Sequence, residues 1–214
     1  NSINNFIKIY NANKQYDFIL SNAGFDNLLY GNPAYNITGE IIVIDRSEDV
    51  ASAIEDLKQC PLIGFDTETR PSFRRGESNT ISLLQLATEK RAYLFRLKKI
   101  GPNQLLKDLL ESNDYLKVGL SVHDDFHSLN RWMPCRPNNF IELQRYVKAF
   151  GIEEMSLQKI YAIVFHKRIS KRQQLSNWEA EELTPAQQQY AAIDAWACRN
   201  IYYELQRKIK VATI

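Results

Sequence analysis

The apolar positions predict a strand, a helix and a second strand in the N-terminal half of the chain. The run EIIVI (40–44) is typical of a buried strand, and residues 47–59 predict a helix with Ser47 as its N-cap and acidic residues in its first turn. The next apolar run, 61–65, predicts a strand that leads directly into an acidic pair.

Two further apolar runs predict a β-hairpin. The segments ISLLQLAT (81–88) and RAYLFRL (91–97) are separated only by the short turn Glu89-Lys90. Together with the strand before them, they indicate three consecutive antiparallel strands.

The second half of the chain is predicted to be mainly helical. A helix near 103–112 precedes a short strand at 116–121, another helix begins near Val122, and strand signals then fade. The last helix begins after Thr184, where a Thr cap, a following Pro and a Gln at the capping-box position form a start signal, and it is expected to run to about Arg207.

Strands that come first and helices that follow predict an α/β domain with a mixed sheet. We assign residues 39–210 to this single domain and residues 1–38, rich in Asn and Tyr, to an N-terminal extension of uncertain structure. A chain of 214 residues with 44% hydrophobic content can bury one substantial core.

The composition indicates a globular chain without a strong overall charge. Lys and Arg number 27 against 25 Asp and Glu, a balance that permits a polyanionic partner without requiring one. No apolar run approaches the roughly 18 residues that a membrane span needs, and the N-terminus lacks the pattern of a signal peptide. We therefore expect no membrane partner and a cytoplasmic location.

The acidic pair Asp66 and Glu68 is the most informative feature of the pattern. Side chains alternate along a strand, so both carboxylates project from one face at the point where the apolar run ends. Two neighbouring carboxylates stay ionised only when a cation or hydrogen-bond donors compensate them. The pair is therefore a candidate site for a divalent cation, with solvated surface charge as the alternative.

Further acids and a tyrosine extend this candidate site. Asp124 and Asp125 both fall in the first turn of the helix that follows strand 116–121, where the helix dipole alone also favours an acid. Tyr190 and Asp194 share a face of the last helix, and Asp194 lies in the apolar stretch AAIDAWAC, where an unpaired carboxylate is costly. Taken singly, each residue is also explained by capping or pairing.

Taken in order, these motifs resemble those of the DEDDy-type 3′-5′ exonucleases of the ribonuclease H-like superfamily, which include ribonuclease D and the Werner syndrome protein exonuclease domain. The motifs are Phe65-Asp66-Thr67-Glu68-Thr69 followed by SLLQLAT, Gly119 through Leu129, and Tyr190 through Ala195, with the similar segments MSLQKIYAIVF and LSNWEAEELTPAQQQYAA between the last two. The resemblance spans about 40–208. It implies a ribonuclease H-like mixed β-sheet flanked by helices, with a helical C-terminal part.

The resemblance also implies the reaction: hydrolysis of phosphodiester bonds from a nucleic-acid 3′ end, with release of nucleoside 5′-monophosphates. In the family's two-metal scheme, two divalent ions about 3.5 to 4 Å apart hold the attacking and leaving oxygens. Oxygen ligands and a phosphate substrate favour Mg²⁺ or Mn²⁺. By resemblance, the metal ligands are Asp66, Glu68, Asp125 and Asp194, and Tyr190 is the fifth catalytic residue, which orients the attacking water because a phenol with a pKa of about 10 is a poor base.

We assign the second-motif ligand to Asp125 and leave Asp124 as a helix-start charge, because the family's Asp is followed by an apolar residue, here Phe126, and by a Leu four positions on. Many relatives carry Asp where this chain has Glu142, a position that is not a metal ligand in the family.

Five residues are predicted to contact the substrate, a DNA or RNA 3′ end: Thr67, Leu86, Phe126, Lys171 and Trp178. Thr67 would present its backbone to the terminal nucleotide, and Phe126 or Leu86 would stack or wedge against the base, with core packing as the alternative. Lys171 belongs to the basic run 166–174, ahead of Trp178, and is expected to contact phosphate. Arg74 and Arg75 form a second candidate phosphate contact.

Two other functions compete with this interpretation. His123 and His127, four positions apart, resemble a zinc-hydrolase helix, but this reading leaves the acidic pair without a role. A catalytically silent nucleic-acid-binding domain of the same fold is the second alternative, which the presence of all five family positions disfavours.

Overall fold

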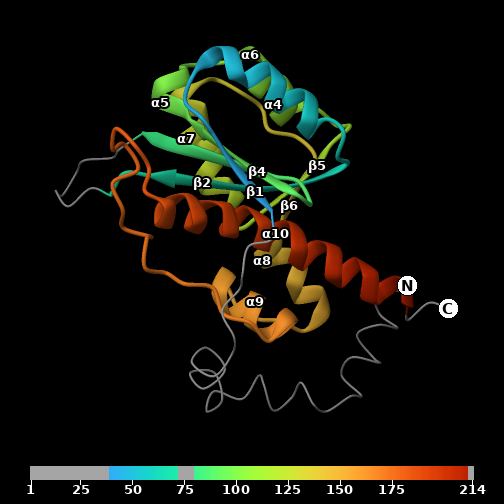
Figure 1. The fold of residues 1–214 in the computed structure, drawn as a ribbon. Helices are drawn as coiled ribbons and strands as arrows, with labels where there is room; N and C mark the ends of the chain where they lie inside the picture. Colours follow the sequence, from blue (N-terminus) through green and yellow to red (C-terminus); the bar gives the residue numbers. More distant parts are fainter. Residues whose placement is uncertain (1–38, 72–79, 212–214) are drawn as a thin grey trace.

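A computed structural model describes residues 39–71 and 80–211 (Figure 1). The predicted extension at 1–38 and the arginine pair at 74–75 lie outside these residues. Helices cover both faces of a single six-stranded sheet in the described part, which confirms the predicted α/β class.

The sheet has the strand order β1-β4-β3-β2-β5-β6 and is mixed. Its strands are β1 (Glu40–Ile44), β2 (Leu62–Thr69), β3 (Ile81–Ala87), β4 (Arg91–Arg96), β5 (Leu116–Gly119) and β6 (Phe140–Glu142). Strands β2, β3 and β4 are consecutively antiparallel, as predicted, whereas β1 pairs with β4, and β5 with both β2 and β6, in parallel. Strand β6 was not predicted, because three residues are too few to show an alternating pattern.

The helical elements follow the predicted order with different boundaries. They are η1 (Ser47–Asp49), α4 (Val50–Leu57), α5 (Leu97–Ile100), α6 (Gln104–Glu111), α7 (Val122–Trp132), α8 (Leu143–Tyr146), η2 (Val147–Phe150), α9 (Leu157–Phe165) and α10 (Pro185–Val211). The capping box before α10 is confirmed, because Gln187 N donates to Thr184 Oγ1 at 3.3 Å and Thr184 N to Gln187 Oε1 at 3.0 Å. The predicted Ser47 N-cap is wrong: Ser47 opens a 3₁₀ turn and α4 begins at Val50.

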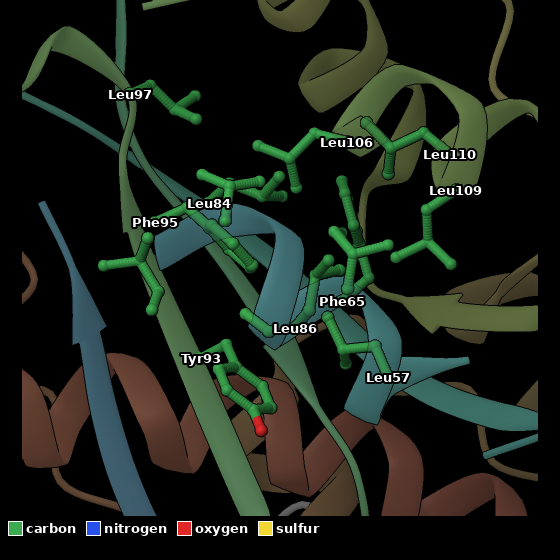
Figure 2. Packing of buried hydrophobic residues seen from close by; sticks show 14 of the residues in the cluster. Leu57, Phe65, Leu84, Leu86, Tyr93, Phe95, Leu97, Leu106, Leu109 and Leu110 are labelled. Atoms are coloured by element: carbon green, nitrogen blue, oxygen red, sulfur yellow. The ribbon is translucent and has the colours of Figure 1, made fainter. Parts of the chain in front are cut away.

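The two faces of the sheet have different partners (Figure 1). Helices α4, α6 and α7 contribute to a hydrophobic cluster with one face, which includes Phe65, Leu84 and Leu86 (Figure 2). On the other face, α10 lies against β2, β3 and β4, with its alanines 191, 192 and 195 fully buried.

Helix α10 approaches β2 very closely at Gly64. A Cβ at this position would lie 2.0 Å from the carbonyl oxygen of Ala195, so no other residue fits without moving the helix. Gly64, Asp66 and Glu68 share the face turned toward α10, because side chains alternate along the strand. The contact therefore brings the acidic pair to the last helix.

Among residues 39–71 and 80–211, no helix is both long and apolar enough to cross a bilayer.

Candidate active site

Three carboxylates from two elements meet where β2 passes under α10. Asp66 and Glu68 come from β2 and Asp194 from α10, and one ligand oxygen from each lies within 4.8 Å of the others. The strand period and the Gly64 contact explain this arrangement: the first turns both strand acids toward the helix, and the second lets Asp194 reach them.

Burial and mutual repulsion act together on the acids of this cluster. Burial raises the pKa of Asp66 well above its usual range, and the negative charges of Asp194, Glu68 and Asp125 act in the same direction. Burial, followed by the charges of Asp194 and Asp125, raises the pKa of Glu68 to about 9. At neutral pH, these groups favour either protons or a cation.

The cluster fits a divalent cation. Asp194 is only 5% exposed, and its Oδ1 atom is buried without a hydrogen-bond partner among the residues that the structure describes. A buried, unpaired carboxylate oxygen is costly, and a bound cation would supply the missing partner. The donors are all carboxylate oxygens, which suits Mg²⁺ or Mn²⁺.

Asp125 lies beside this group but outside it. It sits in the first turn of α7, on the opposite face of the sheet, and the Thr67 hydroxyl donates a hydrogen bond to Asp125 Oδ1. Burial raises the pKa of Asp125 to about 7 despite this hydrogen bond, and the charges of Asp124 and Glu142 add to the rise. The structure therefore gathers three of the four predicted ligands and holds the fourth next to them.

The Thr67 hydroxyl contact was missed by the sequence analysis, which assigned a backbone role to Thr67. Thr67 alternates with Asp66 and Glu68 along β2, so its side chain points to the face that α7 covers. The same alternation was visible in the sequence and could have indicated that Thr67 faces the helix that bears Asp125.

Tyr190 lies one helical turn before Asp194, and its hydroxyl donates a hydrogen bond to the Asp194 carboxylate. Burial, followed by the negative charges of Asp194, Glu68 and Asp66, raises the pKa of Tyr190 far above its usual value. The phenol therefore stays protonated at any ordinary pH. In the metal-free protein, it is therefore a hydrogen-bond donor.

The sequence relationships agree with this geometry. A family model described as 3′-5′ exonuclease matches residues 41–210. The chain belongs to the 3′-5′ exonuclease family. The mouse bifunctional 3′-5′ exonuclease/ATP-dependent helicase WRN is 30% identical over 190 residues, which cover 84% of this chain and 13% of WRN. The putative 3′-5′ exonuclease R431 of Acanthamoeba polyphaga mimivirus is 28% identical over 187 residues, 79% of this chain and 45% of that protein.

Solved structures share the fold of this chain. The Aedes aegypti Nibbler EXO domain has a TM-score of 0.74 at 22% identity, with 83% of this chain and 93% of that chain covered. Escherichia coli RNase D has a TM-score of 0.71 at 22% identity, with 82% and 46% covered. The chain spans only 13 to 45% of the length of the first curated relatives.

Two predicted substrate contacts are corrected by their burial. Leu86 is fully buried and pairs with Phe65, so it points into the core on the face opposite Asp66 (Figure 2). Trp178 is 1% exposed and packs against Tyr190, with ring centroids 6.0 Å apart. Neither side chain has a surface on which a nucleotide could stack. Trp178 instead supports the Tyr190 ring.

Two more of the five predicted contacts, Phe126 and Lys171, are at least partly exposed. Phe126 is half-buried, with its ring 4.7 Å from that of Phe140. Lys171 is exposed, and its positive charge lowers the pKa of Asp194, which burial otherwise raises to about 7. Lys171 is therefore close enough to Asp194 to act on it electrostatically.

The zinc-hydrolase alternative has no structural support. His123 and His127 are both exposed on α7. The three-carboxylate group contains neither histidine, and no cluster of three or more possible metal ligands within 39–71 and 80–211 includes one.

Proposed function

We propose that this exonuclease removes nucleotides one at a time from the 3′ end of DNA or RNA by a two-metal mechanism and releases nucleoside 5′-monophosphates. The observation that carries the proposal is the buried group of Asp66, Glu68 and Asp194, in which burial and the neighbouring acids raise the pKa values of Asp66 and Glu68. Such a group is costly in a protein unless cations are bound.

The carboxylates and their neighbours have separate roles in this mechanism. Asp66, Glu68 and Asp194 would hold the ions, with Asp125 as the fourth ligand. When bound, two Mg²⁺ or Mn²⁺ ions supply Lewis-acid stabilisation of the attacking and leaving oxygens. The protonated phenol of Tyr190 orients the attacking water, since its hydroxyl is fixed by Asp194 at the edge of the group.

The basic segment beside the site would guide the substrate backbone. Lys167, Arg168, Lys171 and Arg172 are all exposed, and Lys171 acts electrostatically on Asp194. Phosphate contacts of this kind position a strand without reading its sequence. We therefore propose that this segment holds the penultimate phosphates of either DNA or RNA.

The proposal is tested with 5′-labelled single-stranded DNA and RNA incubated with Mg²⁺ or Mn²⁺. We expect a metal-dependent ladder of products shortened from the 3′ end and, by chromatography, nucleoside 5′-monophosphates. Asp66→Asn should lower the rate by more than the roughly 10- to 100-fold typical of residues that only support a metal ligand. Asp124→Asn is the matched control, because Asp124 is exposed on α7 and should retain the rate.

Two outcomes would contradict the proposal. The first is wild-type protein that binds oligonucleotides but never shortens them, which would favour the silent nucleic-acid-binding alternative. The second is an Asp66→Asn protein that is as active as the Asp124→Asn control.

A further inference from the structure

The turn that leads into α7 lacks a cap of its own. Ser121, the residue before the helix, has left-handed backbone angles (φ 60°, ψ 33°), and its side chain makes no capping hydrogen bond. A Cβ at Gly119 would lie 2.6 Å from Val122 Cγ1 and 2.8 Å from the Phe65 ring, so the turn is also tight. A left-handed residue other than glycine persists only when its surroundings hold it.

Glu142 provides this support from the neighbouring strand. Its Oε1 atom accepts a hydrogen bond from Ser121 N at 3.0 Å, and its Oε2 atom accepts one from Val122 N at 2.7 Å. Oε1 also accepts a bond from Gln144 N at 3.0 Å, which caps the helix that follows Glu142 itself. One carboxylate thus joins the end of β6 to the start of α7.

The chemistry of this contact calls for a carboxylate. Both oxygens of Glu142 accept hydrogen bonds from backbone N–H groups, and the start of a helix favours negative charge. A glutamine at this position would offer one acceptor and one NH₂ group. The NH₂ group would face a backbone N–H donor, so one of the two contacts to the turn would be lost.

The position of Asp125 depends on the start of its helix more than the positions of the other three acids depend on the ends of their elements. Asp66 and Glu68 lie on a central strand, and Asp194 lies well inside the 27-residue helix α10. Asp125 is in the first turn of an 11-residue helix, where helices fray, and its side chain is tied to Thr67. A shift of the turn would move Asp125 directly.

We propose that Glu142 is a positioning residue of this exonuclease, which keeps Asp125 beside the other three carboxylates by fixing the turn between β5 and α7. The inference rests on the proposed function, because it assumes that Asp125 is a metal ligand. It gives a role to a residue that the sequence analysis left without one.

Glu142→Gln tests the inference through direct metal binding. The Mn²⁺ affinity of each variant is measured without substrate by the electron paramagnetic resonance signal of free Mn²⁺, and kcat and KM are measured on a single-stranded oligonucleotide. We expect Glu142→Gln to weaken Mn²⁺ binding by about 10-fold, at the lower end of the effect of residues that orient metal ligands. The kcat value of Glu142→Gln should fall together with its Mn²⁺ affinity, while its KM stays near the wild-type value.

Asn103→Ala is the matched control. Asn103 Oδ1 caps α6 by accepting hydrogen bonds from Leu105 N at 3.0 Å and Leu106 N at 3.3 Å, and α6 carries none of the site carboxylates. Its loss removes a helix cap without touching the turn before α7, so Mn²⁺ affinity should remain at the wild-type value. Glu142→Asp, which keeps both acceptor oxygens, should bind Mn²⁺ more tightly than Glu142→Gln.

A second background covers failure to fold. Ser121→Gly relieves the left-handed residue, because glycine adopts positive φ angles without strain. If Glu142→Gln alone does not fold, the Mn²⁺ affinity of the double variant Ser121→Gly/Glu142→Gln is compared with that of Ser121→Gly alone. Unchanged Mn²⁺ affinity in Glu142→Gln, or an equal loss in Asn103→Ala, would reduce Glu142 to an ordinary cap and overturn the inference. Wild-type protein that neither binds Mn²⁺ nor shortens oligonucleotides would instead reject the proposed function.

Discussion

The metal-free protein is expected to lose stability as pH rises, because its site carboxylates are buried. Burial raises the pKa of Asp194 from 3.8 to about 7, against the opposing effects of the Tyr190 hydrogen bond and the Lys171 charge. Between these pH values, the folded protein holds a proton that the unfolded chain has released. The resulting stability is fully present below about pH 4 and is lost as pH rises through 7.

The size of this loss of stability follows from the difference between the unfolded and folded pKa values of Asp194. A change from 3.8 to about 7 corresponds to about 4 kcal/mol in the free energy of unfolding, at 1.36 kcal/mol for each pH unit. Glu68, whose pKa rises from 4.5 to about 9 through burial and the charges of Asp194 and Asp125, extends the decline with the same sign to more alkaline pH.

Asp194→Asn tests this reasoning, because asparagine keeps the shape of the side chain and removes its charge. In EDTA at pH 8, we expect the variant to be more stable than wild type by up to about 4 kcal/mol, and at pH 4 to match it. The measurement is urea unfolding at each pH, with equal m-values as the check on two-state behaviour. Mn²⁺ at about 100 times its Kd should narrow this difference, since a ligand at that concentration adds about 2.7 kcal/mol to a protein that binds it.

Asp124→Asn serves as the control for charge alone. Asp124 is exposed at the start of α7, so its neutralisation should change stability by less than about 1 kcal/mol at either pH. The reasoning is refuted if wild-type stability in EDTA increases from pH 5 to pH 8, or if Asp194→Asn gains nothing over wild type at pH 8.

Two further substitutions test individual contacts. Tyr190→Phe removes the hydroxyl that Asp194 fixes, so single-turnover rates should fall about 100-fold, comparable to losing one positioned donor in other enzymes, and an unchanged rate would exclude the orienting role. Gln85 is fully buried opposite Asp66, with neither amide atom bonded among the described residues, so Gln85→Met should raise the unfolding free energy by about 1 to 2 kcal/mol. Leu83→Met on the same face should give no gain, and a loss of stability in Gln85→Met would reveal an unseen partner.

The sequence predicted those features that depend only on residues near one another along the chain. The β3-β4 hairpin, the capping box at Thr184 and Gln187, and the single-face placement of Asp66 and Glu68 each follow from neighbouring residues and were confirmed or placed by the structure. The predicted N-cap at Ser47 was wrong because Ser47 itself begins a 3₁₀ turn. Asp49, at the end of this turn, pairs with Arg46, the residue before the turn, at 2.9 Å.

Contacts between distant segments could not be predicted in this way. The Thr67 bond to Asp125 joins residues 58 positions apart, and the Glu142 bonds to the α7 turn join residues about 20 apart. Their existence depends on β5 and β6 lying in parallel beside β2, an arrangement that no single segment encodes. Leu86 was misassigned for a related reason: β3 is buried on both faces, so its pattern does not distinguish a substrate side from a core side.

The distance between α10 and β2 decides whether the separate acids act as one site. Gly64 and Ala195 are in contact, and the neighbouring alanines 191 and 192 are also fully buried, so the helix axis lies close to the strand. A larger residue at Gly64 would have to push the helix outward, and Asp194 would move away from Asp66. The small alanine side chains of α10 therefore allow the close approach that brings Asp194 to Asp66 and Glu68. An acid within an alanine-rich helix, facing a glycine two residues before an acidic pair, indicates a metal site more strongly than the pair alone.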